Sequence, residues 1–205
     1  MSELKYRMSF TTGGLFLRES PQMVGLYLEC QSWPAACAKV LQQNLFQART
    51  TSTLKRVLRE VVFRLQTFSE SELEALLAGD HQDQGYLLWL AVCRSYRFVA
   101  EFSVEVLRER YLSRLGNIEP EDFEAFFHHK SEWHPELEKI RLSTRKKLRQ
   151  VLFRMLREAD LLSADSQINP ALLSPKFVNI LVSARRTEEL MYFPIFDADF
   201  KRLMS

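Results

Sequence analysis

Apolar residues recur at helical spacing along most of the chain, and the clearest stripe lies within residues 143–159. Its members are spaced i, i+3, i+4, i+7, i+8 and i+11, which is the pattern of an amphipathic helix. They are Leu148, Val151, Leu152, Met155, Leu156 and Ala159. Basic side chains point away from this stripe, so the sequence predicts a helix with one buried face and one cationic face.

The start of this helix has an unusual charge. Ser143 is expected to cap it, because its hydroxyl can accept a hydrogen bond from a first-turn N–H group. Arg145, Lys146 and Lys147 crowd the same end, although the helix dipole favours anions there. This combination predicts a helix start that receives an anion, and phosphate is the expected one.

A near-copy of this stretch occurs ninety residues earlier in the chain. Residues 58–65 align without gaps on residues 148–155, with five identities in eight positions. Two explanations remain open, an internal duplication or a resemblance of composition between two basic helices. Under either one we expect a second basic amphipathic helix at about residues 52–67.

Helical signals also fill the rest of the chain. The expected helices lie at about residues 21–31, 33–45, 69–77, 81–95, 97–115, 119–130, 135–140 and 175–183. Ser20-Pro21 and Ser174-Pro175 are start signals, and Gly79 and Gly116 are expected to end two helices. Residues 86–92 are apolar on nearly every side, which predicts a helix in the middle of the fold.

These elements predict an all-α globular fold with two helix-turn-helix units. Residues 33–45 and 52–67 would form the first unit. Residues 135–140 and 143–159 would form the second, followed by a small β-hairpin wing at 161–168. Gly116 is the expected boundary between an N-terminal region, 1–116, and a C-terminal region, 117–205, packed as one compact unit.

Charge is strongly segregated, although the whole chain carries only +2. Residues 49–64 sum to +4 and residues 141–157 to +7, which leaves −9 for the remainder. This distribution is typical of a protein that holds a polyanion on selected helices. The alternative is that other parts of the fold supply acids to ordinary solvated helix faces.

Candidate DNA contacts are the cations of the two basic helices and the hydroxyl groups at their starts, which suit phosphate. They are Arg49, Thr50, Thr51, Ser52, Thr53, Lys55, Arg56, Arg59, Arg141, Ser143, Thr144, Arg145, Lys146, Lys147, Arg149 and Arg154. Phe63 and Phe153 lie off the apolar stripes. Burial under a neighbouring helix is the favoured explanation for them, and stacking on bases is the alternative.

Motifs for catalysis or metal binding are missing from the sequence. It contains no GxSxG, P-loop or GxGxxG pattern. His128, His129 and His134 fit none of the usual zinc spacings. Asp197 and Asp199 are expected in a solvated turn. We therefore expect no catalytic residue, no metal and no cofactor.

Cysteine usage and hydropathy indicate the compartment. The three cysteines show no CxxC spacing, so we expect reduced thiols in the cytoplasm. The longest apolar run, residues 86–93, is far shorter than the roughly 18–20 residues of a membrane span. The sequence therefore predicts a soluble protein with no membrane partner.

Five stretches of the sequence, in order, resemble the BrxA family of small core proteins of bacteriophage-exclusion (BREX) defence systems. They are TTGGL at 11–15, NLFQART at 44–50, LWLA at 88–91, EWHPEL at 132–137 and STRKKLR at 143–149. The resemblance runs from about residue 6 to the C-terminus. It implies an all-helical bacterial protein, encoded beside a methyltransferase and ATPases, in a system that marks host DNA and blocks phage.

Together, the residues and the resemblance predict a non-enzymatic protein that binds double-stranded DNA mainly through phosphates, and that is a monomer in isolation. The resemblance leaves other BREX core proteins open as partners. Two alternatives remain: a scaffold or adaptor whose basic faces dock other subunits, and an RNA-binding protein.

Overall fold

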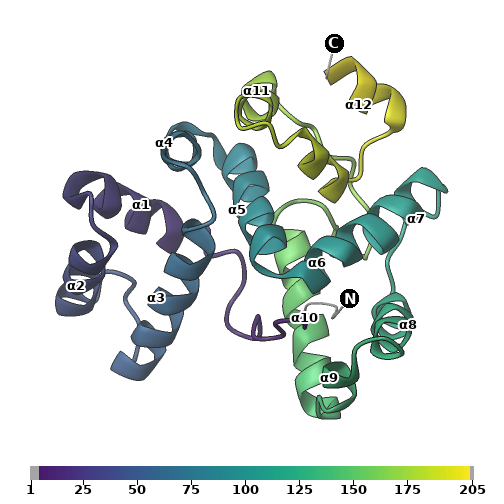
Figure 1. The fold of residues 1–205 in the computed structure, drawn as a ribbon, viewed down its shortest axis with the longest axis horizontal. Coiled ribbons are helices and arrows are strands. Elements are labelled where there is room, and N and C mark those ends of the chain that lie inside the picture. Colours follow the sequence, from purple (N-terminus) through teal and green to yellow (C-terminus); the bar gives the residue numbers. More distant parts are fainter. Residues whose placement is uncertain (1–4, 204–205) are drawn as a thin grey trace.

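The computed structural model describes residues 5–203, which fold into helices joined by short connections (Figure 1). The elements are α1 (Glu19–Cys30), α2 (Trp33–Gln43), α3 (Thr51–Leu65), α4 (Glu70–Ala78), α5 (His81–Ser95), α6 (Arg97–Phe102), the π-helical segment η1 (Ser103–Arg108), α7 (Glu109–Leu112), α8 (Pro120–Ser131), α9 (Pro135–Glu138), α10 (Leu142–Glu158), α11 (Pro175–Ser183), the 3-10 segment η2 (Thr187–Tyr192) and α12 (Asp197–Leu203). No strand is formed by the described residues, and the expected all-α class is confirmed.

Helix α5 lies in the middle of the fold, as its apolar sequence predicts. Every residue from 85 to 93 is buried, and α5 packs against α3, α4, α6, α10 and η2. The indole N–H of Trp89 donates a hydrogen bond to the Tyr192 carbonyl at 3.1 Å. The buried apolar residues form one cluster that includes residues on both sides of Gly116. The division into two regions at that glycine stays a prediction.

Several helix starts follow their local sequence signals. The Ser174 hydroxyl accepts from the N–H of Phe177 at the start of α11. Thr50 caps α3 in the same way through Thr53. Ser69 and Glu72 form a capping box at the start of α4. Side-chain capping of this kind contributes typically about 1 kcal/mol to a helix.

Two of the expected boundaries are wrong. Helix α1 begins at Glu19, so Ser20 lies inside it and is buried. The end of α4 is as expected, because Gly79 is its C-cap, although its φ of −75° is not left-handed. The helix expected at 97–115 contains a π segment and ends at Leu112, where Arg114 (φ 58°) takes the left-handed conformation in place of Gly116.

The C-terminal part departs from the sequence expectation in its details. Asp197 and Asp199 belong to α12, so the expected turn is wrong. The wing region contains only isolated antiparallel bridges, one of them between Leu162 and Ile168. No strands form around that bridge in the described chain, so the winged helix-turn-helix stays a prediction.

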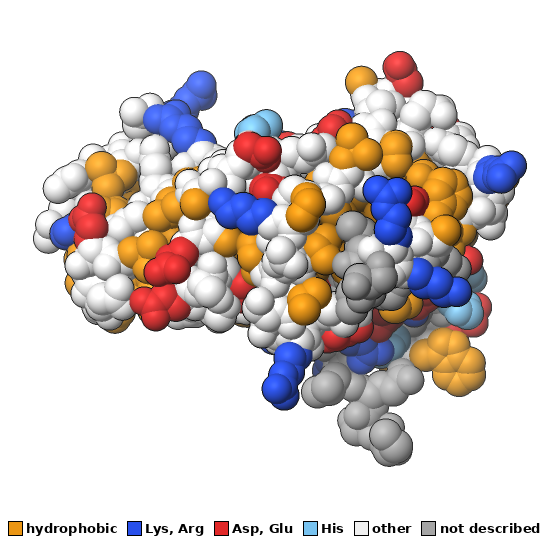
Figure 2. All heavy atoms as spheres, turned by 90° about the horizontal axis from the view of Figure 1, so that it is seen from above, with side chains coloured by type: hydrophobic (Ala, Val, Ile, Leu, Met, Phe, Trp, Pro, Cys, Tyr) orange, Lys and Arg blue, Asp and Glu red, His pale blue; other side chains and the backbone are white. Residues whose placement is uncertain are grey.

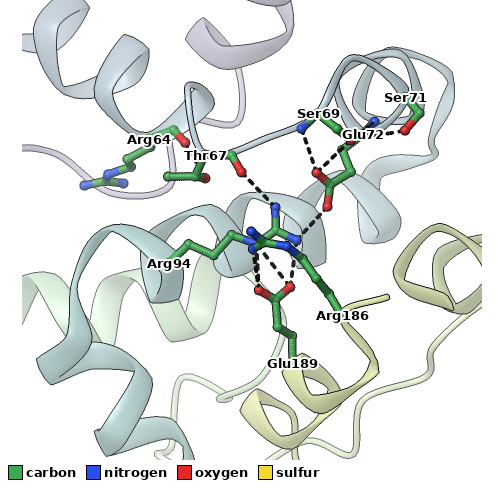
Figure 3. Close-up of polar contacts among 8 residues, drawn as sticks. All are labelled: Arg64, Thr67, Ser69, Ser71, Glu72, Arg94, Arg186 and Glu189. Atoms are coloured by element: carbon green, nitrogen blue, oxygen red, sulfur yellow. Dashed lines mark hydrogen bonds and ion pairs between the residues drawn. The ribbon is translucent and has the colours of Figure 1, made fainter. Parts of the chain in front are cut away.

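A buried arginine joins α4, α5 and η2 (Figure 3). The guanidinium of Arg94 in α5 donates to Glu72 in α4 at 2.6 Å and to Glu189 in η2 at 2.7 Å. Burial alone would raise the pKa of the Glu72 carboxyl, but hydrogen bonds from Arg94 and Ser69 hold that pKa below its usual value. The joint therefore depends on charges that are stabilised by each other inside the protein.

Candidate nucleic-acid interface

The two basic helices, α3 and α10, start at the same edge of the molecule. In Figure 1 both run upward from the lower edge, and the chain that precedes α1 passes between them. Their far ends are connected through that segment. Arg64 of α3 donates to the Gly14 carbonyl at 2.7 Å, and the N–H of Leu15 donates to Glu158 of α10 at 2.5 Å.

The carbonyl of Gly14 and the N–H of Leu15 belong to one peptide unit, so a single peptide connects the two basic helices. A Cβ atom at Gly14 would overlap the Glu158 carboxylate, which explains why a glycine stands there. Gly13 has φ +71°, a conformation that other residues adopt only with strain. We call this connection the Gly14 joint. The adjacent glycines of residues 11–15 were its only signal in the sequence.

The inner end of α3 is held by buried polar side chains. Arg64 also donates to Glu60 at 2.8 Å, and the Tyr96 hydroxyl donates to the same carboxylate at 2.5 Å. Burial, and then the hydrogen bond to Glu60, raise the pKa of Tyr96 to about 12. The hydroxyl therefore stays protonated at neutral pH and remains a donor.

The outer part of α3 carries cations that face solvent. Arg49, Lys55, Arg56 and Arg59 are all exposed, and none of the four forms an ion pair within residues 5–203. The hydroxyl groups at this helix start differ in whether they already have a hydrogen-bond partner. Those of Thr50 and Thr53 bond to each other at 2.9 Å. Thr51 and Ser52 are exposed. The start of α3 thus offers a cluster of available cations.

In α10, by contrast, Glu124 of α8 and Glu158 of α10 itself engage three of the predicted contacts. Arg145 and Arg149 both pair with Glu124 of α8, the latter at 2.7 Å. Arg154 pairs with Glu158 at 2.7 Å. Another element therefore supplies an acid to Arg145 and Arg149, as the alternative explanation of the charge pattern expects, whereas Arg154 pairs within its own helix.

The remaining predicted cationic contacts lie at the start of α10. Arg141, Lys146 and Lys147 are exposed, and within the described chain none of them pairs with an acid. The expectation that Ser143 caps this helix is wrong. The N-cap position is Arg141, whose side chain offers no acceptor, and Ser143 and Thr144 are exposed in the first turn. First-turn N–H groups without a side-chain cap are favourable partners for an anion.

The two phenylalanines behave as the favoured explanation expects. Phe153 is buried. Phe63 is half-buried, packs edge-on against Tyr96, and carries the guanidinium of Arg7 over its ring at 3.6 Å from the centroid. Stacking on a base would require Arg7 to leave that position.

The opposite edge of the molecule is different in character. Figure 2 views it from the top of Figure 1, away from the starts of α3 and α10. Lys and Arg side chains are separate from one another in that view, with acidic and apolar side chains between them. Among the described side chains visible there, no extended basic surface forms.

The histidines and acids do not gather into a metal site. Within residues 5–203, no group of three or more His, Cys, Asp or Glu side chains is arranged to hold a metal ion. His134 is buried and lies against Tyr6, whereas His128 and His129 are exposed. None of the helices in the described part of the chain is both long and apolar enough to cross a membrane.

Comparison with known proteins gives the family. The BrxA family model matches residues 4–185. The chain belongs to the BrxA family. This confirms the resemblance seen in the five sequence stretches.

A relative and a solved structure extend this result. BREX protein BrxA of Bacillus cereus (strain H3081.97) is 27% identical over 121 residues, which are 59% of this BrxA-family chain and about three fifths (60%) of that protein. The crystal structure of an uncharacterized protein from Magnetospirillum magneticum matches with a TM-score of 0.80 at 18% identity, over 92% of this chain and 97% of that one. The second match supports the fold alone.

Proposed function

We propose that this BrxA-family protein is a non-enzymatic component of a BREX phage-defence system that binds double-stranded DNA. The observation that carries the proposal is the placement of exposed cations at two helix starts on one edge. They are Arg49, Lys55, Arg56, Arg59, Arg141, Lys146 and Lys147. None has an acidic partner among the described residues, so each is available to neutralise a phosphate.

Phosphate contacts dominate this proposed interface. The available side chains are long, flexible cations, and contacts of this type position a protein on a duplex without reading its sequence. The uncapped start of α10 would add backbone N–H groups to the same phosphate row. Weak sequence preference is therefore expected.

The family supports the wider role. A relative is named as a BREX protein, which supports a role in a BREX system. Other BREX core proteins are the proposed protein partners, and the protein is proposed to be a soluble cytoplasmic monomer in isolation.

A mobility-shift titration with duplex DNA, single-stranded DNA and RNA of equal length tests the proposal. We expect the tightest binding to the duplex. If about five to eight phosphates are neutralised, log K should fall with log salt at a slope of about −4 to −7. Tighter binding to RNA or to single strands would refute the duplex proposal, and an affinity independent of salt would refute phosphate contacts altogether.

A further inference from the structure

A groove between α2 and α3 is lined mainly by apolar side chains and encloses about 460 Å³. Leu41 of α2 and Leu58, Val62 and Phe63 of α3 form its apolar lining. Leu41 is 38% exposed, so part of this apolar lining faces solvent. An exposed apolar surface of this kind is typical of a binding site.

Cations stand at the rim of the groove. Lys55 and Arg59 of α3 and Arg7 from the N-terminal segment contribute to its lining. Lys55 and Arg59 are exposed without an ion pair in residues 5–203. Arg7 lies over the Phe63 ring. Arg56, by contrast, is not part of the groove. Two cations of α3 therefore line the groove, and Arg56 lies outside it.

We propose that this groove docks an acidic amphipathic helix of a partner protein. Apolar residues at i, i+3 or i+4 and i+7 of the partner would enter the groove, as in other helix-in-groove complexes. Asp or Glu residues beside them would meet Lys55, Arg59 and Arg7. The occupant follows from this charge complementarity together with the apolar lining.

Duplex DNA fits the groove less well than such a helix. A phosphate backbone would satisfy the rim cations but would leave the apolar lining uncovered. The Phe63 ring is already covered by Arg7, so a base would have to displace that guanidinium before it could stack. The inference thus goes beyond the DNA-binding proposal and uses a surface that is only partly shared with it.

The test measures binding of a fluorescein-labelled helical peptide of about 18 residues, roughly five turns, with Leu on one face and Glu on both flanks. The full chain is titrated and fluorescence anisotropy is recorded. We expect saturable binding that weakens at least tenfold in Leu41→Glu. Leu77→Glu is the matched control, because Leu77 of α4 is 40% exposed and lies outside the groove. Its binding should equal that of the wild type.

A second measurement does not depend on a variant in the apolar lining. Cys37 also lines the groove, and burial raises the pKa of its thiol. In a Cys30→Ser background, alkylation of Cys37 at mildly alkaline pH should slow when the peptide is bound.

Three outcomes would overturn the inference: equal peptide binding by Leu41→Glu and Leu77→Glu, equal binding of a peptide with Lys in place of Glu, or unchanged Cys37 alkylation. Binding of a fluorescent fatty acid in place of the peptide would also refute it and assign the groove to an acyl chain. Leu41→Asn, which adds no negative charge beside Lys55 and Arg59, should also weaken peptide binding and should leave duplex binding unchanged. A failure of the docking inference is therefore distinguishable from a failure of the DNA proposal.

Discussion

Helices α3 and α10 share a sequence pattern but differ in which side chains they bury. The aligned pairs Leu58 and Leu148, and Val61 and Val151, are buried in both helices. The aligned arginines are not equivalent. The side chain of Arg64 is 3% exposed and that of Arg154 is 63% exposed.

The buried faces extend to opposite flanks of the shared stripe. Helix α3 adds Glu60 and Arg64 to its buried face, whereas α10 adds Leu152, Phe153 and Leu156. At 100° per residue these additions lie on opposite sides of the common positions. The shared sequence pattern therefore determines which residues form the centre of the buried face. The neighbouring elements of the fold determine which further residues on either side of that centre are buried.

The surrounding fold also decides how many cations of each helix are available to DNA, so the formal charge of a segment does not measure its binding strength. The segment around α10 carries +7 against +4 around α3. Glu124 and Glu158 engage three arginines of α10. Charge alone therefore does not rank α10 above α3 as a DNA-binding helix.

The largest expected effect comes from removing the two aligned arginines. Arg64→Met leaves the buried Glu60 carboxylate without its ion pair and should cost about 3–5 kcal/mol of unfolding free energy. Arg154→Met removes a largely exposed pair and should cost less than about 1 kcal/mol. Urea denaturation followed by circular dichroism measures both. Equal costs would show that the two positions are equivalent after all.

Charge reversal at the helix starts compares the two helices in DNA binding. Lys55→Glu with Arg56→Glu, and Lys146→Glu with Lys147→Glu, should each weaken duplex binding more than tenfold at low salt. The salt slope should flatten by about one unit for each phosphate that the variant no longer neutralises. The four exposed side chains have no ion pair in the described chain, so folding should persist, and the quadruple variant should bind at background level. A mobility-shift assay that finds one double variant unaffected would show that the two residues reversed in it do not contact DNA.

Acid should loosen the Arg94 joint beside α3. Because the folded-state pKa of Glu72 is lowered, the stability it contributes is present above its unfolded pKa and is lost as pH falls through the folded pKa. Unfolding free energy should therefore fall below about pH 5, and less steeply in Glu72→Gln than in the wild type. Glu74→Gln, an exposed acid on the same helix, serves as the control. Parallel pH profiles for wild type and Glu72→Gln would contradict this role.

The smallest expected effect comes from freeing the arginines of α10. Glu124→Gln removes the acid that holds Arg145 and Arg149 and should strengthen duplex binding a few-fold, by about 0.5–1 kcal/mol. Glu121→Gln, an exposed acid of the same helix α8, removes equal charge without touching either arginine. Titrations at low salt should separate the two variants. If both raise the affinity equally, only net charge matters and the Glu124 contacts are irrelevant to binding.

Helical periodicity was sufficient to predict most of the elements. It identified the central position of α5, the extent of α10 within about one residue, and the start of α11, because each signal is local. It could not predict that Glu124 pairs with arginines more than twenty residues away. Such partners are chosen by tertiary packing, which a local pattern does not contain.

For the candidate nucleic-acid interface, too, local signals were readable from the sequence and tertiary ones were not. The candidate contacts were chosen from their chemistry, and the i,i+4 spacing of Arg154 and Glu158 is a local signal for their ion pair, but no local pattern indicated that Glu124 would engage Arg145 and Arg149. The Ser143 cap failed because the helix begins one residue earlier, at Leu142. A hydroxyl one position inside a helix no longer has the extended backbone that a cap requires.

The Gly14 joint has a consequence for how far the sequence can diverge. Its acceptor and donor are a backbone carbonyl and a backbone N–H, which every residue except proline supplies in the same form. Residues flanking the joint can therefore change their side chains while the connection between α3 and α10 persists. Three identities remain fixed: an arginine at 64, a carboxylate at 158, and a glycine at 14, where any Cβ would meet that carboxylate. A connection made by the main chain therefore places a requirement on few side chains, and neighbouring positions can vary without breaking it.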